Sequence, residues 1–248
     1  MQRRRSRPCD PIRIGNTSVV PSSYITCLGV PIDCELSFKQ HVTKTASACF
    51  STLRNLKCIR RSVPQPLFAS LVEALVLSRL SYCISVLYGC LLSLLCRLQA
   101  ILHASARQVF LCGRFSHVTP LLQRLKWPSV VDRIQIRLAS LAHACDRGFA
   151  PVYLSKELRL ASDLPGRRSL RSATAKSLVL PLARHPTLGG RSFSVAAVRV
   201  WNRLPRHLTS VDCPKAFKKA LRSHCMSAAF YFFNLSLSLL IFLFGNRP

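Results

Sequence analysis

Apolar residues recur at steps of three and four from residue 37 to residue 148, and this period constrains the fold more than any other feature. The spacing gives each segment one apolar face and predicts helices rather than strands. In the first segment these residues are Val42, Ala46, Cys49, Phe50, Leu53, Leu56 and Ile59. Proline and glycine divide the run into five predicted helices: one from Ser37 to the turn before Pro64, and four over residues 64–88, 91–111, 117–126 and 128–148. Residues 37–158 are therefore expected to form a helical bundle.

The first 36 residues follow a pattern that is typical of strands. Ile12–Ile14 and Thr17–Val19 flank Gly15-Asn16, a pair that permits the positive φ angles of a tight hairpin. Residues 24–32 add one more short apolar run. So small a sheet buries too little surface to be stable alone. Residues 1–36 are therefore expected to be a small sheet fragment.

Beyond residue 158 the chain changes character twice. Residues 159–190 are rich in Ser, Arg, Pro and Gly, which predicts a basic linker rather than a packed element. Residues 191–226 regain helical spacing and are expected to form short helices. The expected fold class is therefore mainly α. It comprises a helical bundle between a short β-hairpin fragment and a basic, partly irregular tail, with an apolar helix at the C-terminus.

The C-terminal segment, residues 227–245, carries no charge, and Asn234 is its only strongly polar side chain. As a helix it would span about 28 Å at 1.5 Å per residue, close to the ~30 Å thickness of the bilayer hydrocarbon. A cluster of cations before it favours an orientation with the N-terminal side in the cytoplasm. These cations are Lys215, Lys218, Lys219 and Arg222. The segment is thus a candidate transmembrane helix, and the alternatives are a buried terminal helix and an apolar tail translated out of frame.

The net charge of +27, from 36 Lys and Arg against 9 Asp and Glu, indicates what kind of partner the chain binds. Such an excess calls for a polyanion, of which nucleic acid is the first choice and an anionic membrane surface the second. The alternative is a chain never selected for solubility, such as translated genomic debris. Two cationic clusters suit phosphate contacts, with an ordinary solvated face as the alternative for each. They are Arg54, Lys57, Arg60 and Arg61 in the first helix and Arg167, Arg168 and Arg171 in the linker.

Catalysis and metal binding find little support in the sequence. None of the 12 cysteines belongs to a Cys-x-x-Cys pair, and no secretory signal is recognised, so we expect free thiols in a reducing, intracellular compartment. Metal-dependent polymerisation needs clustered carboxylates, yet only Asp33 and Glu35 lie close together in the sequence. No Gly-rich phosphate loop is present. We therefore expect no enzymatic activity, no metal site and no cofactor.

Short motifs follow the order seen in one known family. They are Cys27-Leu28-Gly29-Val30, Leu36-Ser37-Phe38-Lys39-Gln40-His41-Val42, Tyr82-Cys83, Leu98-Gln99, Leu125-Lys126-Trp127, Arg168-Ser169-Leu170-Arg171-Ser172, Arg191-Ser192-Phe193-Ser194, Trp201-Asn202-Arg203-Leu204-Pro205 and Phe217-Lys218-Lys219-Ala220-Leu221. In this order they resemble the thumb and post-polymerase region of jockey-like LINE (non-LTR) retrotransposon reverse transcriptases, over residues 12–225. Three features depart from the family: Ser81 where Asp is usual, Cys27 where an aromatic residue is usual, and the apolar stretch after Ser227.

The resemblance implies a fold and a function. Residues 1–36 would be a remnant of the palm sheet and residues 37–158 a thumb-like bundle that grips a template–primer duplex. The family's catalytic Asp pair would lie upstream of residue 1. The chain would then be a non-catalytic fragment of an RNA-directed DNA polymerase, in the nucleus or cytoplasm, that binds RNA–DNA or DNA. Two alternatives stay open: a small membrane protein anchored by residues 227–245 and without enzymatic activity, and a non-functional translated remnant.

The two tryptophans of the chain could have either of two roles. Trp127 and Trp201 could stack on nucleic-acid bases. Both, however, stand beside Leu or Pro at helical spacing, where aromatic residues usually pack. They are therefore expected to be core residues. The sequence does not set the oligomeric state.

Overall fold

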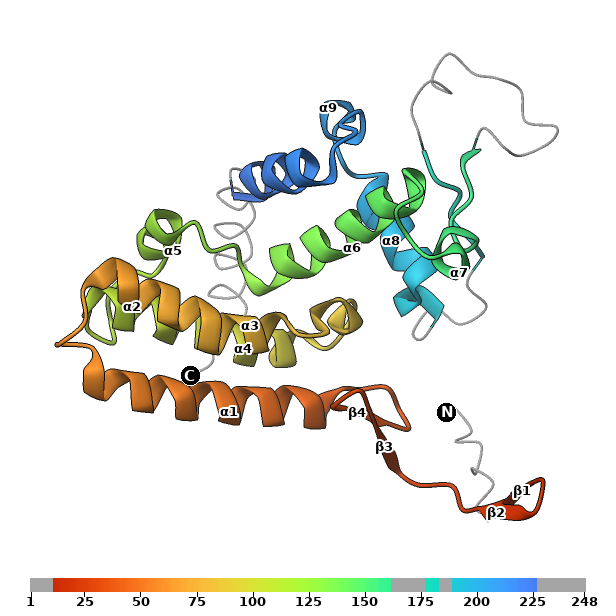
Figure 1. Cartoon of the computed structure of the whole chain (residues 1–248), viewed down its shortest axis with the longest axis horizontal. Coiled ribbons are helices and arrows are strands. Elements are labelled where there is room, and N and C mark those ends of the chain that lie inside the picture. The colour runs from red at the N-terminus through yellow and green to blue at the C-terminus, as the bar shows by residue number, and fades with distance from the viewer. Residues whose placement is uncertain (1–10, 162–176, 183–188, 227–248) are drawn as a thin grey trace, which may run out of the picture.

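The computed structural model describes residues 11–161, 177–182 and 189–226 of the chain. Two small antiparallel strand pairs lie at the N-terminal end, and the rest of the described chain is mainly helical (Figure 1). The expected fold class, a mainly α protein that begins with a short β-hairpin, is confirmed. Two of the expected parts, the cluster Arg167, Arg168 and Arg171 and the apolar segment 227–245, lie outside the described residues.

The predicted hairpin is present as β1 (Ile12–Ile14) and β2 (Thr17–Val19), with Gly15 in the turn at a φ of 60°. The next apolar run, predicted as one segment, is instead a second hairpin of β3 (Tyr24–Cys27) and β4 (Val30–Asp33). Its two turn residues both have positive φ, which matches the right-handed twist of the flanking strands. The two hairpins do not join into one sheet. β1 and β2 are wholly exposed, whereas β4 places Val30 in the core.

The first long helix, α1 (Lys39–Ile59), forms as the apolar spacing predicts. Its inward side buries Val42, Cys49 and Leu53, and this side packs against α4 (Leu92–Phe110). Asp33 fixes the start, because its carboxylate accepts hydrogen bonds from the backbone N–H groups of Ser37 and Phe38 at 3.0 and 2.9 Å. The strand β4 and the helix α1 are therefore held together by one side chain.

The second predicted helix is not continuous. It consists of α2 (Gln65–Val72), the π-helical turn η1 (Glu73–Leu77) and α3 (Ser78–Ser81). The expectation that it continues to Tyr88 is wrong, because Tyr82 leaves the helix with an extended backbone and its hydroxyl donates to the Leu28 carbonyl at 2.6 Å. A short 3₁₀ turn, η2 (Ile84–Leu87), follows.

The next three helices match their predicted ranges. They are α4, α5 (Thr119–Leu125) and α6 (Val130–Asp146). A capping box begins α6: the Ser129 hydroxyl accepts from the backbone N–H of Asp132, and the Asp132 carboxylate accepts from that of Ser129. The helix therefore starts where its local sequence satisfies the first free N–H groups.

The C-terminal helices pack onto α6 rather than standing apart. After the short α7 (Val152–Ser155) and η5 (Gly189–Arg191) come α8 (Phe193–Trp201) and α9 (Arg206–Thr209). A last helix covers residues 214–226, and we call it the 214–226 helix. Aromatic contacts join these parts, since the rings of His143 and Phe217 stack at 4.2 Å and Trp201 lies 6.1 Å from Phe217. One apolar core thus runs through the described chain from Val30 to Cys225.

Both tryptophans belong to this core, as expected. Trp127 is 3% exposed and Trp201 is 2% exposed. The indole N–H of Trp127 donates to the Glu73 carboxylate at 2.6 Å, which satisfies its only polar atom. Neither ring faces solvent, so neither is placed to stack on a base.

Candidate nucleic-acid interface

The acidic side chains of the described chain are largely engaged in structural contacts. Seven of the nine acids fall in the described ranges, since Asp10 and Asp163 lie outside them. Those in structural contacts cap α1, hold Trp127, cap α6 or pair with Arg147. They are Asp33, Glu73, Asp132, Asp146 and Asp212. Between described residues, the ion pairs are those of Arg147 alone. The remaining surface cations are therefore not neutralised by carboxylates of the described chain.

The C-terminal half of α1 presents cations to solvent. Arg54 and Lys57 are exposed, and their spacing of three places them on one side of the helix; Arg61, in the turn after the helix, is exposed as well. Within the described ranges, none of these three side chains donates a hydrogen bond or forms an ion pair. This part of the predicted cluster therefore has the exposure that a phosphate contact needs.

Arg60, the fourth residue of the predicted cluster, points the other way. Its side chain is 7% exposed and its guanidinium donates to three carbonyl oxygens: Gln108 at 3.0 Å, Val63 at 3.1 Å and Val109 at 2.6 Å. It also lies 4.9 Å from the centre of the Phe68 ring. We therefore correct the sequence prediction and remove Arg60 from the candidate phosphate ligands, because its hydrogen-bonding capacity is used inside the fold.

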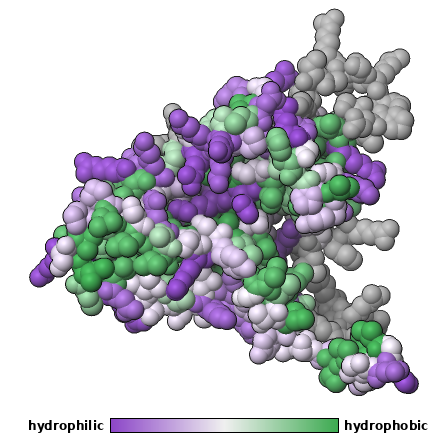
Figure 2. Space-filling view, in the orientation of Figure 1, coloured by the Kyte–Doolittle hydropathy of each residue, from purple (hydrophilic) through white to green (hydrophobic). Residues whose placement is uncertain are grey.

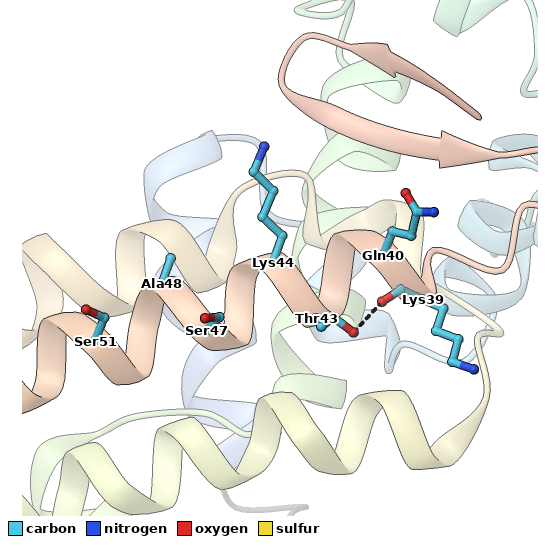
Figure 3. A pocket seen from close by; sticks show the side chains of 7 residues that line it. All are labelled: Lys39, Gln40, Thr43, Lys44, Ser47, Ala48 and Ser51. Carbon is cyan, nitrogen blue, oxygen red and sulfur yellow. Dashed lines mark hydrogen bonds between the residues drawn. The ribbon is translucent and has the colours of Figure 1, made fainter. Parts of the chain in front are cut away.

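The N-terminal half of α1 adds a shallow, open hollow (Figure 3). All the residues that line it belong to α1, so it is a face of the helix and not an enclosed cavity. They are Lys39, Gln40, Thr43, Lys44, Ser47, Ala48 and Ser51. Figure 3 shows the two lysines extending from the helix in different directions, with short side chains along the same helix. Thr43 is held in place, because its hydroxyl donates to the Lys39 carbonyl at 2.9 Å and accepts from Arg97 at 3.2 Å.

We call the exposed cations of α1 and of the turn after it, with the small polar residues between them, the α1 face: Lys39, Lys44, Arg54, Lys57 and Arg61. The helix contains no acidic residue. From Lys39 to Lys57 the helical part of the face is about 27 Å long at 1.5 Å per residue, somewhat less than one turn of a B-form duplex at ~34 Å. Lys39 and Lys44 were not predicted as site residues. The absence of acidic residues from the whole helix could have indicated that its cationic surface extends to them.

Asp33, one of the two acids that lie close together in the sequence, has a structural contact. Burial would raise the pKa of Asp33, but hydrogen bonds from Ser37 and Phe38 outweigh it and hold the pKa below its usual value. The carboxylate is thereby committed to the start of α1. In the described part of the chain, no three His, Cys, Asp or Glu side chains lie close enough together to hold a metal ion. The cysteines in the described part of the chain are all free thiols.

The membrane alternative depends on a segment that the structure leaves undescribed. Among the residues that are described, no helix has both the length and the apolar character needed to cross a bilayer. The predicted cluster of Arg167, Arg168 and Arg171 also lies outside the described residues.

Comparison with known proteins gives no independent assignment. No family model matches the chain, and searches of curated proteins and of solved structures found no match. What the chain does is therefore inferred from its own residues, and the one surface of α1 that is acid-free, exposed and cationic is where that inference begins.

Proposed function

We propose that the chain is a non-catalytic nucleic-acid-binding unit that holds the phosphate backbone of a duplex through the α1 face. One observation carries the proposal: α1 has no acidic residue, and its exposed cations extend over its whole length. Lysine and arginine contacts to phosphates supply affinity that does not depend on sequence. The small residues Ser47, Ala48 and Ser51 leave room for a backbone to approach the helix closely.

The sequence resemblance adds a role to this binding. In a thumb-like fragment of a LINE-type reverse transcriptase, the partner would be an RNA–DNA or DNA duplex in the nucleus or cytoplasm. The described helical bundle is compatible with such a fragment. The engaged acids, Asp33 and Glu73 among them, offer no cluster of free carboxylates for two-metal polymerisation. We therefore propose binding without polymerisation.

The test measures binding of the full chain to an RNA–DNA duplex across a series of salt concentrations. We expect log K to fall linearly with log salt, because each phosphate contact releases counterions. The variant R54A/K57A/R61A should weaken binding and reduce that slope by about one for each lost contact. A matched control, R13A/K156A/R159A, removes the same charge from exposed positions outside the α1 face and should change the slope far less.

Two results would overturn the proposal. One is the absence of binding at low salt by a chain that is shown to be folded by circular dichroism. The other is an equal loss of affinity in the test variant and the control, which would mean that net charge, and not the α1 face, attracts the duplex.

A further inference from the structure

A second group of cations lies on the 214–226 helix, far along the chain from α1. Lys215, Lys218, Lys219 and Arg222 are all exposed, and their spacing places them on one side of the helix. We call them the C-terminal cation row. Another side of the same helix is buried in the core through Phe217, Leu221 and Cys225. No ion pair joins the row to a carboxylate of the described chain. Figure 2 shows hydrophilic side chains gathered over this upper side of the molecule.

Arg133 of α6 is half-buried, and Arg222 of the row is one of the charges that act on it. Its guanidinium donates to the Pro128 carbonyl and to the Ser81 hydroxyl, both at 3.1 Å. Burial, followed by the nearby positive charge of Arg222, lowers the pKa of Arg133 to about 10, while Glu73 acts in the opposite direction. Glu73 forms no ion pair with Arg133, and its carboxylate accepts the Trp127 N–H instead. Arg133 therefore forms no ion pair with a carboxylate of the described chain, although Glu73 partly offsets the effect of Arg222 on its pKa.

Phosphate oxygens suit guanidinium groups especially well, because both N–H groups of the fork can donate to one phosphate. The row itself spans about 10 Å along its helix at 1.5 Å per residue. A line of cations fits a chain of repeating phosphates better than it fits one free ion.

The helices that carry these cations, α1 and the 214–226 helix, lie on different sides of the described structure (Figure 1). α1 packs against α4, and α4 packs against α6. The 214–226 helix lies on α6, where Phe217 stacks on His143. Two layers of helices therefore separate the two cationic surfaces, and one straight duplex cannot lie along both.

We propose that the C-terminal cation row is a second phosphodiester-binding surface, so that one copy of the chain holds two nucleic-acid segments at once. The second surface is argued from its own geometry, and the simultaneous binding of two segments rests on the function proposed for the α1 face. The chain then acts as a bridge between two duplexes rather than as a clamp on one.

The experiment counts duplexes and detects bridging separately. Titration of the full chain with a short RNA–DNA duplex should give two duplexes per chain for the native protein. It should give one for R54A/K57A/R61A and one for K215Q/K218Q/K219Q/R222Q. In the second measurement a bead-bound duplex captures a fluorescent duplex through the protein. The native chain and the control R13A/K156A/R159A should capture it, and both surface variants should reduce capture to background.

The outcomes separate this inference from the proposed function. If K215Q/K218Q/K219Q/R222Q still binds two duplexes and still captures the fluorescent one, the second surface is wrong while the α1 face stands. If R54A/K57A/R61A still binds two duplexes while K215Q/K218Q/K219Q/R222Q binds one, the α1 face is wrong and the second surface stands. An equimolar mixture of the two variants should also fail to capture. Capture by that mixture would mean that two copies make the bridge, which would overturn the single-chain bridge.

Discussion

The end of α1 and the start of α6 each turn an arginine inward, but in opposite electrostatic settings. Arg60 meets the carbonyl end of α4, where the helix dipole is negative and the oxygens of Gln108 and Val109 are free to accept. Arg133 lies in the first turns of α6, at the positive end of its dipole, and has Arg222 nearby.

This difference shows that burial alone does not say what an arginine contributes. Arg60 completes the hydrogen bonding of another helix, so its charge stabilises the fold. Arg133 also donates two hydrogen bonds, but burial first and the positive charge of Arg222 second lower its pKa, with Glu73 acting in the opposite direction. The charge of Arg60 is thus offset by carbonyl oxygens, whereas Arg133 has a second guanidinium among the charges that act on it.

The largest effect is expected from Arg60→Met, which should lower the free energy of unfolding by about 3 kcal/mol, because buried carbonyls lose charged donors. Urea denaturation measures it. The matched control is Arg61→Met at the neighbouring exposed position, expected to change stability by less than about 0.5 kcal/mol. Equal costs at the two positions would remove the distinction between the inward and the outward arginine.

Local chemistry was enough to predict much of the fold. The apolar period located α1, α4, α5 and α6, because each buries a face whose residues recur every three or four positions. The Gly15-Asn16 pair located the first hairpin. The break after Ser81 was not predictable, because its cause is a hydrogen bond to Leu28, 54 residues earlier in the chain.

The same limit applies to the candidate site. Arg54, Lys57 and Arg61 were predicted in exposed positions because helical spacing defines an outward face. Arg60 has the same local context, and only the distant carbonyls of α4 turn it inward. The local sequence did not mark Arg133 as unusual, since its lowered pKa depends partly on Arg222, which lies far along the chain. Contacts between distant segments decide which cations remain free.

A smaller and pH-dependent effect is expected from Arg133→Met, at about 1 kcal/mol near neutral pH, because relief of repulsion offsets part of the lost hydrogen bonding. Burial lowers the pKa of Arg133 to about 10 in the folded chain, below its value in the unfolded chain. Above pH 10 the unfolded chain therefore binds more protons, so the native protein gains stability relative to the variant as pH rises. Denaturation at pH 8 to 11 measures this gain, and a difference that does not change with pH would contradict it.

The smallest effect is expected from Arg222→Gln, which removes the second partner of the repulsion. It should stabilise the chain by about 0.5 kcal/mol at low ionic strength and by nothing measurable near 1 M salt, where the Debye length is about 3 Å. The control Lys156→Gln removes the same charge from an exposed site elsewhere and should leave stability unchanged. Because a bound phosphate would relieve the same repulsion, the variant should gain stability and lose affinity at the C-terminal cation row together. A variant that gains stability but keeps native affinity there would show that the strain between Arg133 and Arg222 is unrelated to binding.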